Sequence, residues 1–149
     1  MVGLVAITPA SGFAAPVTSI ILGAVASVVC FLFVVKVKNA LGYDDTLDVF
    51  GVHAVGGILG ALLTGIFVSP ALGGPSVVSD WVTGKTEYPG YLAQLWIQAK
   101  AVGITILWSG TVAYVSYWIV NLLIGLRVPE DEEREGLDIS SHGESAYRM

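Results

Sequence analysis

The chain has 149 residues, of which 54% are hydrophobic and only 13% charged, and its mean hydropathy is +0.75. A water-soluble domain of this size does not normally show that balance, so the composition indicates a membrane protein. Most of the formal charge of -5 comes from residues 127–149, where seven acidic residues outnumber three basic ones. Such an acidic end argues against nucleic acid and anionic lipid as its partners, because both bind clustered Lys and Arg.

The first nine residues are too few to cross a bilayer. At about 1.5 Å per residue they span roughly 13 Å of helix, and Pro9 and Gly12 then interrupt the helical pattern. We expect residues 1–9 to be a stub, the end of a helix in a truncated chain. The following run, residues 16–35, has no charge and starts with Pro16, which suits a first helical turn, so it predicts the first complete span.

Opposite charges flank the connection to the next span. Lys36 and Lys38 follow the first span, and cations at a helix end and in a short connection favour the cytoplasmic side. Asp45 and Asp48 precede the next apolar run, which places them at the cytoplasmic mouth as a variant of the capping box. Simple capping of the next helix is the interpretation that we favour for both carboxylates.

The second span, residues 47–68, contains the only histidine in hydrophobic sequence. An imidazole at that depth is costly unless it is paired or faces a polar path. Taken alone, His53 fits two roles equally well. It could be a structural residue that donates to a carbonyl of a neighbouring helix, or it could line a pore. Five glycines in this span, including Gly56 and Gly57, give the small-xxx-small spacing of closely packed membrane helices and predict a close neighbour, or a narrow pore, beside the ring.

The rest of the chain is predicted to be a loop, a third span and a tail. Residues 69–90 are rich in Pro and Gly and contain one basic residue, so we expect an external loop. The segment 91–126 is long enough to be tilted, broken or extended beyond the bilayer. Within it, Trp108 and Ser109 fit either a cavity wall, as pore-side support, or helix packing, which is the simpler alternative.

The tail, residues 127–149, is predicted to lie in the cytoplasm. Four cations fall on that side of the predicted topology, at 36, 38, 127 and 134, against two on the other, at 85 and 100. A short helix is expected near its start, with a pair between Glu130 and Arg134 and a stop at Gly136.

The segment DVFGVHAVGG, residues 48–57, closely resembles the Amt/Rh/Mep family of ammonium transporters. Residues 3–10 resemble the end of that family's eighth membrane helix, and the three spans resemble its ninth, tenth and eleventh. Three further segments resemble the family's cytoplasmic tail, in its prokaryotic Amt form rather than its Rh form: 125–129, 135–138 and 142–147. The implied fold is all-α: a partial, polytopic transmembrane helix bundle made of the end of one helix plus three transmembrane helices. Residues 1–126 are then the transmembrane region.

By this resemblance, His53 is the second of two histidines stacked in a narrow, hydrophobic pore. A bare ammonium ion in hydrocarbon has an idealised cost on the order of 20 kcal/mol, so the pore must replace its water shell or remove its proton. A paired imidazole can pass the proton while the neutral amine passes separately. The resemblance therefore implies transport of ammonium or ammonia, with methylammonium as an analogue, across the cytoplasmic membrane by a homotrimer with one pore per subunit.

The same resemblance implies a regulatory role for the tail, which composition alone describes as a solvated extension. It predicts docking on the cytoplasmic face, where a PII-type signal protein binds in relatives. The residues expected to dock the tail are Arg127, Glu130, Gly136 and Asp138. No catalytic residue, metal site or cofactor is predicted, so we expect no enzyme. The alternative function is a non-transporting membrane module whose acidic tail binds a cytoplasmic regulator, since the first pore histidine is not in this chain.

Overall fold

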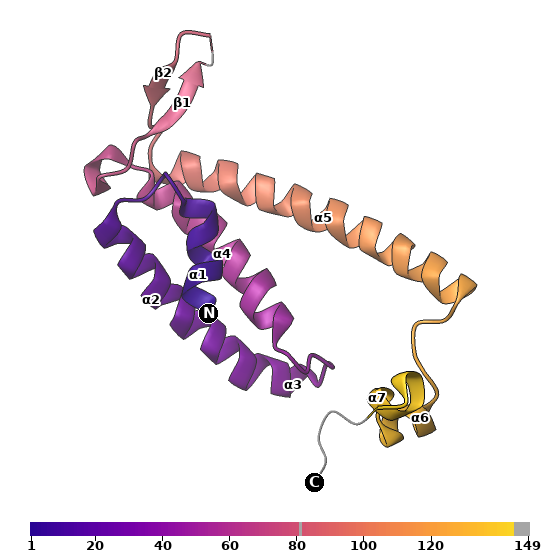
Figure 1. The fold of residues 1–149 in the computed structure, drawn as a ribbon. Helices are drawn as coiled ribbons and strands as arrows, with labels where there is room; N and C mark the ends of the chain where they lie inside the picture. The colour runs from indigo at the N-terminus through magenta and orange to yellow at the C-terminus, as the bar shows by residue number, and fades with distance from the viewer. Residues whose placement is uncertain (81, 145–149) are drawn as a thin grey trace. The chain divides into compact units, whose positions relative to one another are not determined.

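The computed structural model describes residues 1–80 and 82–144, and it is predominantly helical (Figure 1). The chain divides into two compact units, Met1–Thr105 and Ile106–Met149. Among the described residues, three helices are long and apolar enough to cross a membrane: Pro16–Leu41, Phe50–Phe67 and Tyr91–Leu123. The expected class, a partial helical transmembrane bundle, is confirmed.

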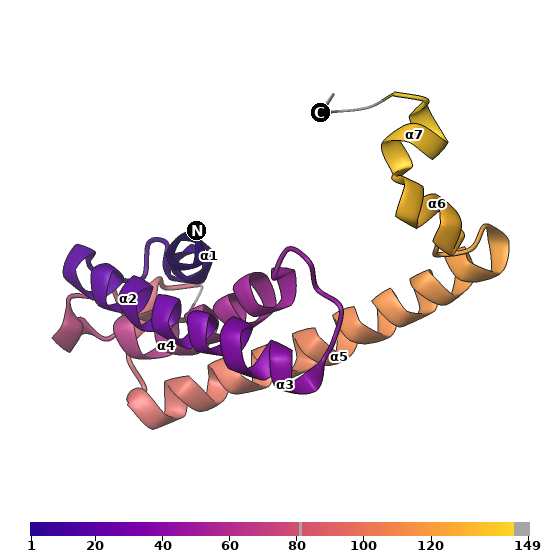
Figure 2. The same cartoon turned by 90° about the horizontal axis from the view of Figure 1, so that it is seen from below.

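Three helices of the first unit pack against one another. They are α1 (Val2–Ile7), α2 (Pro16–Leu32) and α4 (Val55–Phe67), which lie side by side in both views (Figures 1 and 2). A short 3₁₀ turn, η1 (Thr8–Ala10), follows α1. The buried residues at this contact are mostly small: Ala6, Ala10, Leu22 and Ala26. Small side chains allow the helix backbones to approach closely, as in other membrane helix bundles.

The helical path of α2 extends beyond the predicted end of its span. It continues through a π-helical segment, η2 (Phe33–Lys38), and a short α3 (Asn39–Leu41), and it stops at Gly42, whose φ is 63°. A left-handed glycine is a common way to end a helix, because glycine has no Cβ to clash there.

The helix of the second span begins after Asp48. Asp48 has a φ of 55°, which no helix interior accepts, and the next helical element is the π-helical η3 (Phe50–Ala54), which leads into α4. The apolar pattern alone places the start at residue 47, because a left-handed residue leaves no mark in hydropathy.

The segment between the second and third spans is only partly a loop. After a 3₁₀ turn, η4 (Pro70–Leu72), it forms a two-stranded antiparallel hairpin of β1 (Val77–Asp80) and β2 (Lys85–Glu87). Val77 is opposite Glu87, and the pairing becomes irregular between Val78 and Asp80. These strands were not predicted, because short strands among many Pro and Gly residues give little periodic signal.

The third candidate span is one unbroken helix, α5 (Tyr91–Leu123), so the broken alternative is wrong. Its first turns pack on α4 at Gly65, where an added Cβ would lie 2.9 Å from Cγ of Gln98. At the same contact the Tyr88 hydroxyl donates to the Gly65 carbonyl oxygen at 3.0 Å, and the rings of Tyr88 and Tyr91 meet edge to face. Desolvation, together with the neighbouring Tyr91, raises the pKa of Tyr88.

The second unit contains the rest of α5 and two short helices, α6 (Glu130–Glu135) and α7 (Leu137–His142). The expected pair is present, since a guanidinium nitrogen of Arg134 lies 2.6 Å from a carboxylate oxygen of Glu130. Gly136, with a φ of 103°, ends α6 as expected.

Candidate functional site

His53 lies in the π-helical turn η3, at an exposed position. In this wide turn the amide of Val55 donates to the carbonyl oxygen of Phe50, five residues earlier. Such turns are rare within helices and are frequent at functional sites. The candidate site is therefore the start of the second span, where an exposed imidazole projects from an irregular part of an apolar helix.

Two contacts fix this turn against the preceding helix. A Cβ on Gly51 would lie 2.5 Å from Cγ2 of Val34, so any larger residue here would displace the Val34 side chain between η3 and η2. The ring of Phe50 lies 5.8 Å, between centroids, from the rings of both Phe33 and Tyr43. Glycine allows the close approach, and the aromatic cluster fills the space beside it.

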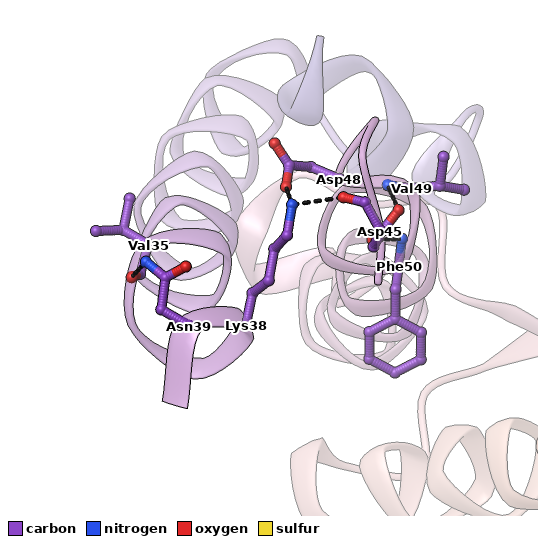
Figure 3. Close-up of polar contacts among 7 residues, drawn as sticks. All are labelled: Val35, Lys38, Asn39, Asp45, Asp48, Val49 and Phe50. Carbon is purple, nitrogen blue, oxygen red and sulfur yellow. Dashed lines mark hydrogen bonds and ion pairs between the residues drawn. The ribbon is translucent and has the colours of Figure 1, made fainter. Parts of the chain in front are cut away.

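Charged side chains connect the two helices directly before this turn (Figure 3). The ammonium group of Lys38 lies 2.6 Å from Oδ1 of Asp48 and also donates to the backbone carbonyl oxygen of Asp45. The Asp45 carboxylate accepts hydrogen bonds from the amides of Val49 and Phe50, each at 2.8 Å. Amides at a helix start lack helical partners, so Asp45 satisfies two of them.

The two aspartates thus differ in what they contact. Asp45 has the geometry of a capping residue, whereas the Asp48 side chain forms an ion pair with Lys38. The Asp48 backbone is left-handed, a conformation that Asp and Asn tolerate better than most residues. The spacing of the two carboxylates fits a capping box and does not distinguish their roles.

The glycines beside His53 also differ. Gly56 faces the core, where an added Cβ would lie 3.5 Å from Sγ of Cys30 and 3.6 Å from a methyl carbon of Val5. Gly60, one turn later, is tighter still, with the Ala6 carbonyl oxygen 2.1 Å from an added Cβ. A Cβ on Gly57 would have no described atom within 4 Å. Of the two glycines predicted to support the pore side, only Gly57 borders open space in the described structure.

A hollow of about 350 Å³ lies between α1, α2 and the start of the second span. Its walls are largely apolar, with two polar members, Ser27 and Asp48. Asp48, the partner of Lys38, therefore forms part of the wall of this hollow.

The remaining predicted site residues belong to the second unit. Trp108 and Ser109 are exposed on α5, with 73% of Trp108 accessible. In the tail, Glu130 pairs with Arg134, and the Gly136 carbonyl oxygen accepts from the amides of Ile139 and Ser140. The backbone carbonyl of Asp138 accepts from Glu144, and Arg127 precedes α6. These contacts organise the tail locally, and its docking stays a prediction.

Comparison with known families identifies the chain. The family model of the Ammonium Transporter Family matches residues 1–147. The chain belongs to this family. It is 46% identical to an ammonium transporter of Aquifex aeolicus (strain VF5), over 99% of this chain and 32% of the relative. It is 42% identical to an ammonium transporter of Bacillus subtilis (strain 168), over 98% of this chain and 34% of the relative. A putative ammonium transporter of Methanothermobacter thermautotrophicus is 43% identical, over 99% of this chain and 35% of the relative.

The chain spans about a third of the length of the curated relatives that it matches. Family membership and the three candidate spans together make this ammonium-transporter-family chain a multi-pass membrane protein. The resemblance seen in the motif around His53 is confirmed.

Sequence reasoning missed one partner at the candidate site, Lys38. Its position in the sequence indicates only a cation at a helix end and on the cytoplasmic side, yet Lys38 contacts both Asp45 and Asp48. Opposite charges at the two ends of a short connection were the available signal, but residues 38 and 48 are too far apart for any helix-spacing rule to pair them.

Proposed function

We propose that this chain is the C-terminal third of an ammonium-transporting subunit and that His53 lines its pore. The observation that carries the proposal is the family match over residues 1–147, which includes the motif around His53. The exposed position of this imidazole on an apolar span, next to the open side at Gly57, supports the same role. An ionisable side chain on a membrane span is by default a functional residue.

In the proposed mechanism, His53 takes part in a proton relay. The pore strips the water shell from ammonium, and the hydrophobic passage does not stabilise the bare cation. An imidazole therefore accepts the proton of ammonium, and the neutral amine passes separately. Gly57 leaves room for a small substrate beside the ring, and Gly56 keeps the supporting helices close. Trp108 and Ser109 support the pore side, while Asp45 and Asp48 stand at the cytoplasmic mouth.

The proposed arrangement in the membrane follows the predicted boundaries. Residues 1–126 are the transmembrane region, with the stub 1–9 and spans at about 16–35, 47–68 and 91–126. Residues 127–149 form a cytoplasmic tail that docks on the membrane part of a homotrimer in the cell membrane. The docking residues are Arg127, Glu130, Gly136 and Asp138, and a PII-type signal protein is the proposed regulator at that face.

One observation favours a second candidate function, a non-transporting membrane module with a regulator-binding tail. The first turn of α6 consists of four acidic residues, Glu130–Glu133, all exposed. An exposed acidic helix start suits a basic surface of a soluble partner.

Methylammonium uptake distinguishes the two functions. Cells deficient in ammonium transport would express either this chain alone or a chimera, in which the chain replaces the matching third of the Aquifex aeolicus relative. We expect uptake from the chimera only, with the intact relative as the positive control. A chimera that reaches the membrane in normal amount but does not transport would favour the non-transporting module.

The role of His53 is tested by His53→Ala in the chimera. Loss of a proton-transfer group lowers rates by about 100-fold or more, so we expect uptake to fall at least about tenfold at unchanged protein level. The matched control is His142→Ala, which removes an exposed imidazole of the tail and leaves the second span unchanged, so uptake should stay normal. Normal flux and selectivity in the His53→Ala chimera would contradict the relay.

A further inference from the structure

We propose that Lys38 is a positioning residue, whose ion pair with Asp48 sets the direction in which His53 projects from its helix. This inference rests on the proposed pore role of His53, but it concerns the geometry of the turn. Lys38 acts through Asp48 and the backbone, and it does not contact the imidazole.

One ammonium group connects both ends of the segment between the spans. Lys38 is the last residue of η2, and it holds the Asp48 side chain and the Asp45 backbone together (Figure 3). The pair is partly buried, with exposed fractions of 22% for the Lys38 side chain and 36% for that of Asp48. Charge-assisted hydrogen bonds in such surroundings hold more firmly than fully exposed ion pairs.

Asp48 transmits this constraint to the turn that contains His53. Its left-handed backbone directs the side chain back to Lys38, while its carbonyl oxygen accepts from the amide of Val52 at 2.9 Å. Val52 is the neighbour of His53 in the sequence. The residue that binds Lys38 is therefore also the residue on which the histidine turn begins.

The turn that contains His53 has an alternative geometry, the regular α-helix. A π turn holds one more residue than an α-helical turn, so conversion to regular helix would rotate His53 about the helix axis. The following helix cannot take up that rotation, because Gly60 fits against the Ala6 backbone with no space for a methyl group. Release of Asp48 would consequently change residues 49–54 and leave α4 in place.

Thiol labelling in the chimera reads this geometry directly. On a background without other cysteines, which includes Cys30→Ala, the thiol to be labelled comes from His53→Cys or, as a reference in α4, from Ile58→Cys. Lys38→Met and Asp48→Asn each remove the charge pair with little change in size, and Asn still tolerates the left-handed backbone. We expect both variants to change the labelling rate at position 53 about fivefold or more and to leave that at position 58 within about twofold.

Two control variants separate positioning from general disturbance. Lys38→Arg retains a cation that can reach Asp48 and should restore the original labelling rate. Lys36→Met removes a neighbouring charge of η2 for which the described residues provide no ion pair, and it should change neither position. An unchanged rate at position 53 in Lys38→Met, or an equal change at both positions, would overturn the proposal.

Uptake measurements distinguish failure of this inference from failure of the proposed function. With His53 present, Lys38→Met should lower methylammonium uptake severalfold, and in the His53→Ala chimera it should cause no further loss. Altered labelling without any effect of either substitution on uptake would keep the positioning role and refute the pore role of His53. Equal losses from Lys38→Met in both backgrounds would show that Lys38 acts independently of the histidine and would refute the positioning role.

Discussion

At the scale of single residues, the site depends on how each charge is satisfied. Asp45 provides both oxygens of one carboxylate to two consecutive backbone amides, and its carbonyl oxygen accepts from Lys38. Asp45 thus connects the start of one helix to a side chain of the preceding helix, and it stabilises both helix ends. The sequence pattern of two aspartates predicted a cap, but the division of labour between them depends on the backbone angle of Asp48.

Asp45→Ala should therefore loosen the start of the second span. The amides of Val49 and Phe50 would lose their acceptors, and removal of a capping residue costs about 1 kcal/mol, so their hydrogen exchange should accelerate roughly fivefold. Exchange measured by mass spectrometry on the detergent-solubilised chimera checks this. Asp45→Asn, which keeps one acceptor oxygen, should give a smaller acceleration. Equal exchange in all three proteins would mean that water replaces the carboxylate at no cost.

At the scale of helices and strands, the sequence predicts the presence of the long helices better than their local backbone geometry. Long apolar runs indicate three spans because the hydrocarbon thickness sets the required length, and the described part of the chain contains three such helices. The hairpin and the two π-helical segments were not predicted, since they arise from local backbone angles and from contacts such as that of Gly51 with Val34. Glycine spacing predicted close packing, but not which glycine meets which neighbour.

The two faces of α4 allow a matched test of that packing. Gly60→Ala places a methyl group against the Ala6 backbone, which overpacks the contact and should destabilise the first unit by about 1–3 kcal/mol. Gly57→Ala meets no described atom and replaces a poor helix former, so it should be neutral or stabilising by up to about 1 kcal/mol. The thermal midpoints of the two chimera variants in detergent provide the comparison. A Gly60→Ala midpoint equal to that of Gly57→Ala would show that α1 moves away without cost.

At the scale of the whole molecule, the family could be predicted from short motifs, because the residues around His53 and in the tail are specific in combination. The arrangement of the pore could not be predicted in the same way, because His53 was expected to pair with a histidine that this sequence does not contain. The described structure leaves His53 exposed, and none of the residues in the hydrophobic window of α5 is buried. A lipid-facing helix tolerates apolar exposure, but an unpaired imidazole and close-packing glycine faces need protein neighbours.

The chain expressed alone should consequently assemble poorly. Polar and close-packing surfaces exposed to lipid favour non-native association, so we expect aggregates or rapid degradation, whereas the chimera should elute as a single species. Size-exclusion chromatography in mild detergent, with limited proteolysis of the eluted protein, checks both expectations. His53→Leu in the isolated chain is the matched variant, because it removes the polar ring and retains the exposed glycines. If it alone restored a monodisperse, protease-resistant species, the imidazole would be the main obstacle. A monodisperse and protease-resistant unmodified chain would contradict the prediction, because three spans would then satisfy their own packing surfaces.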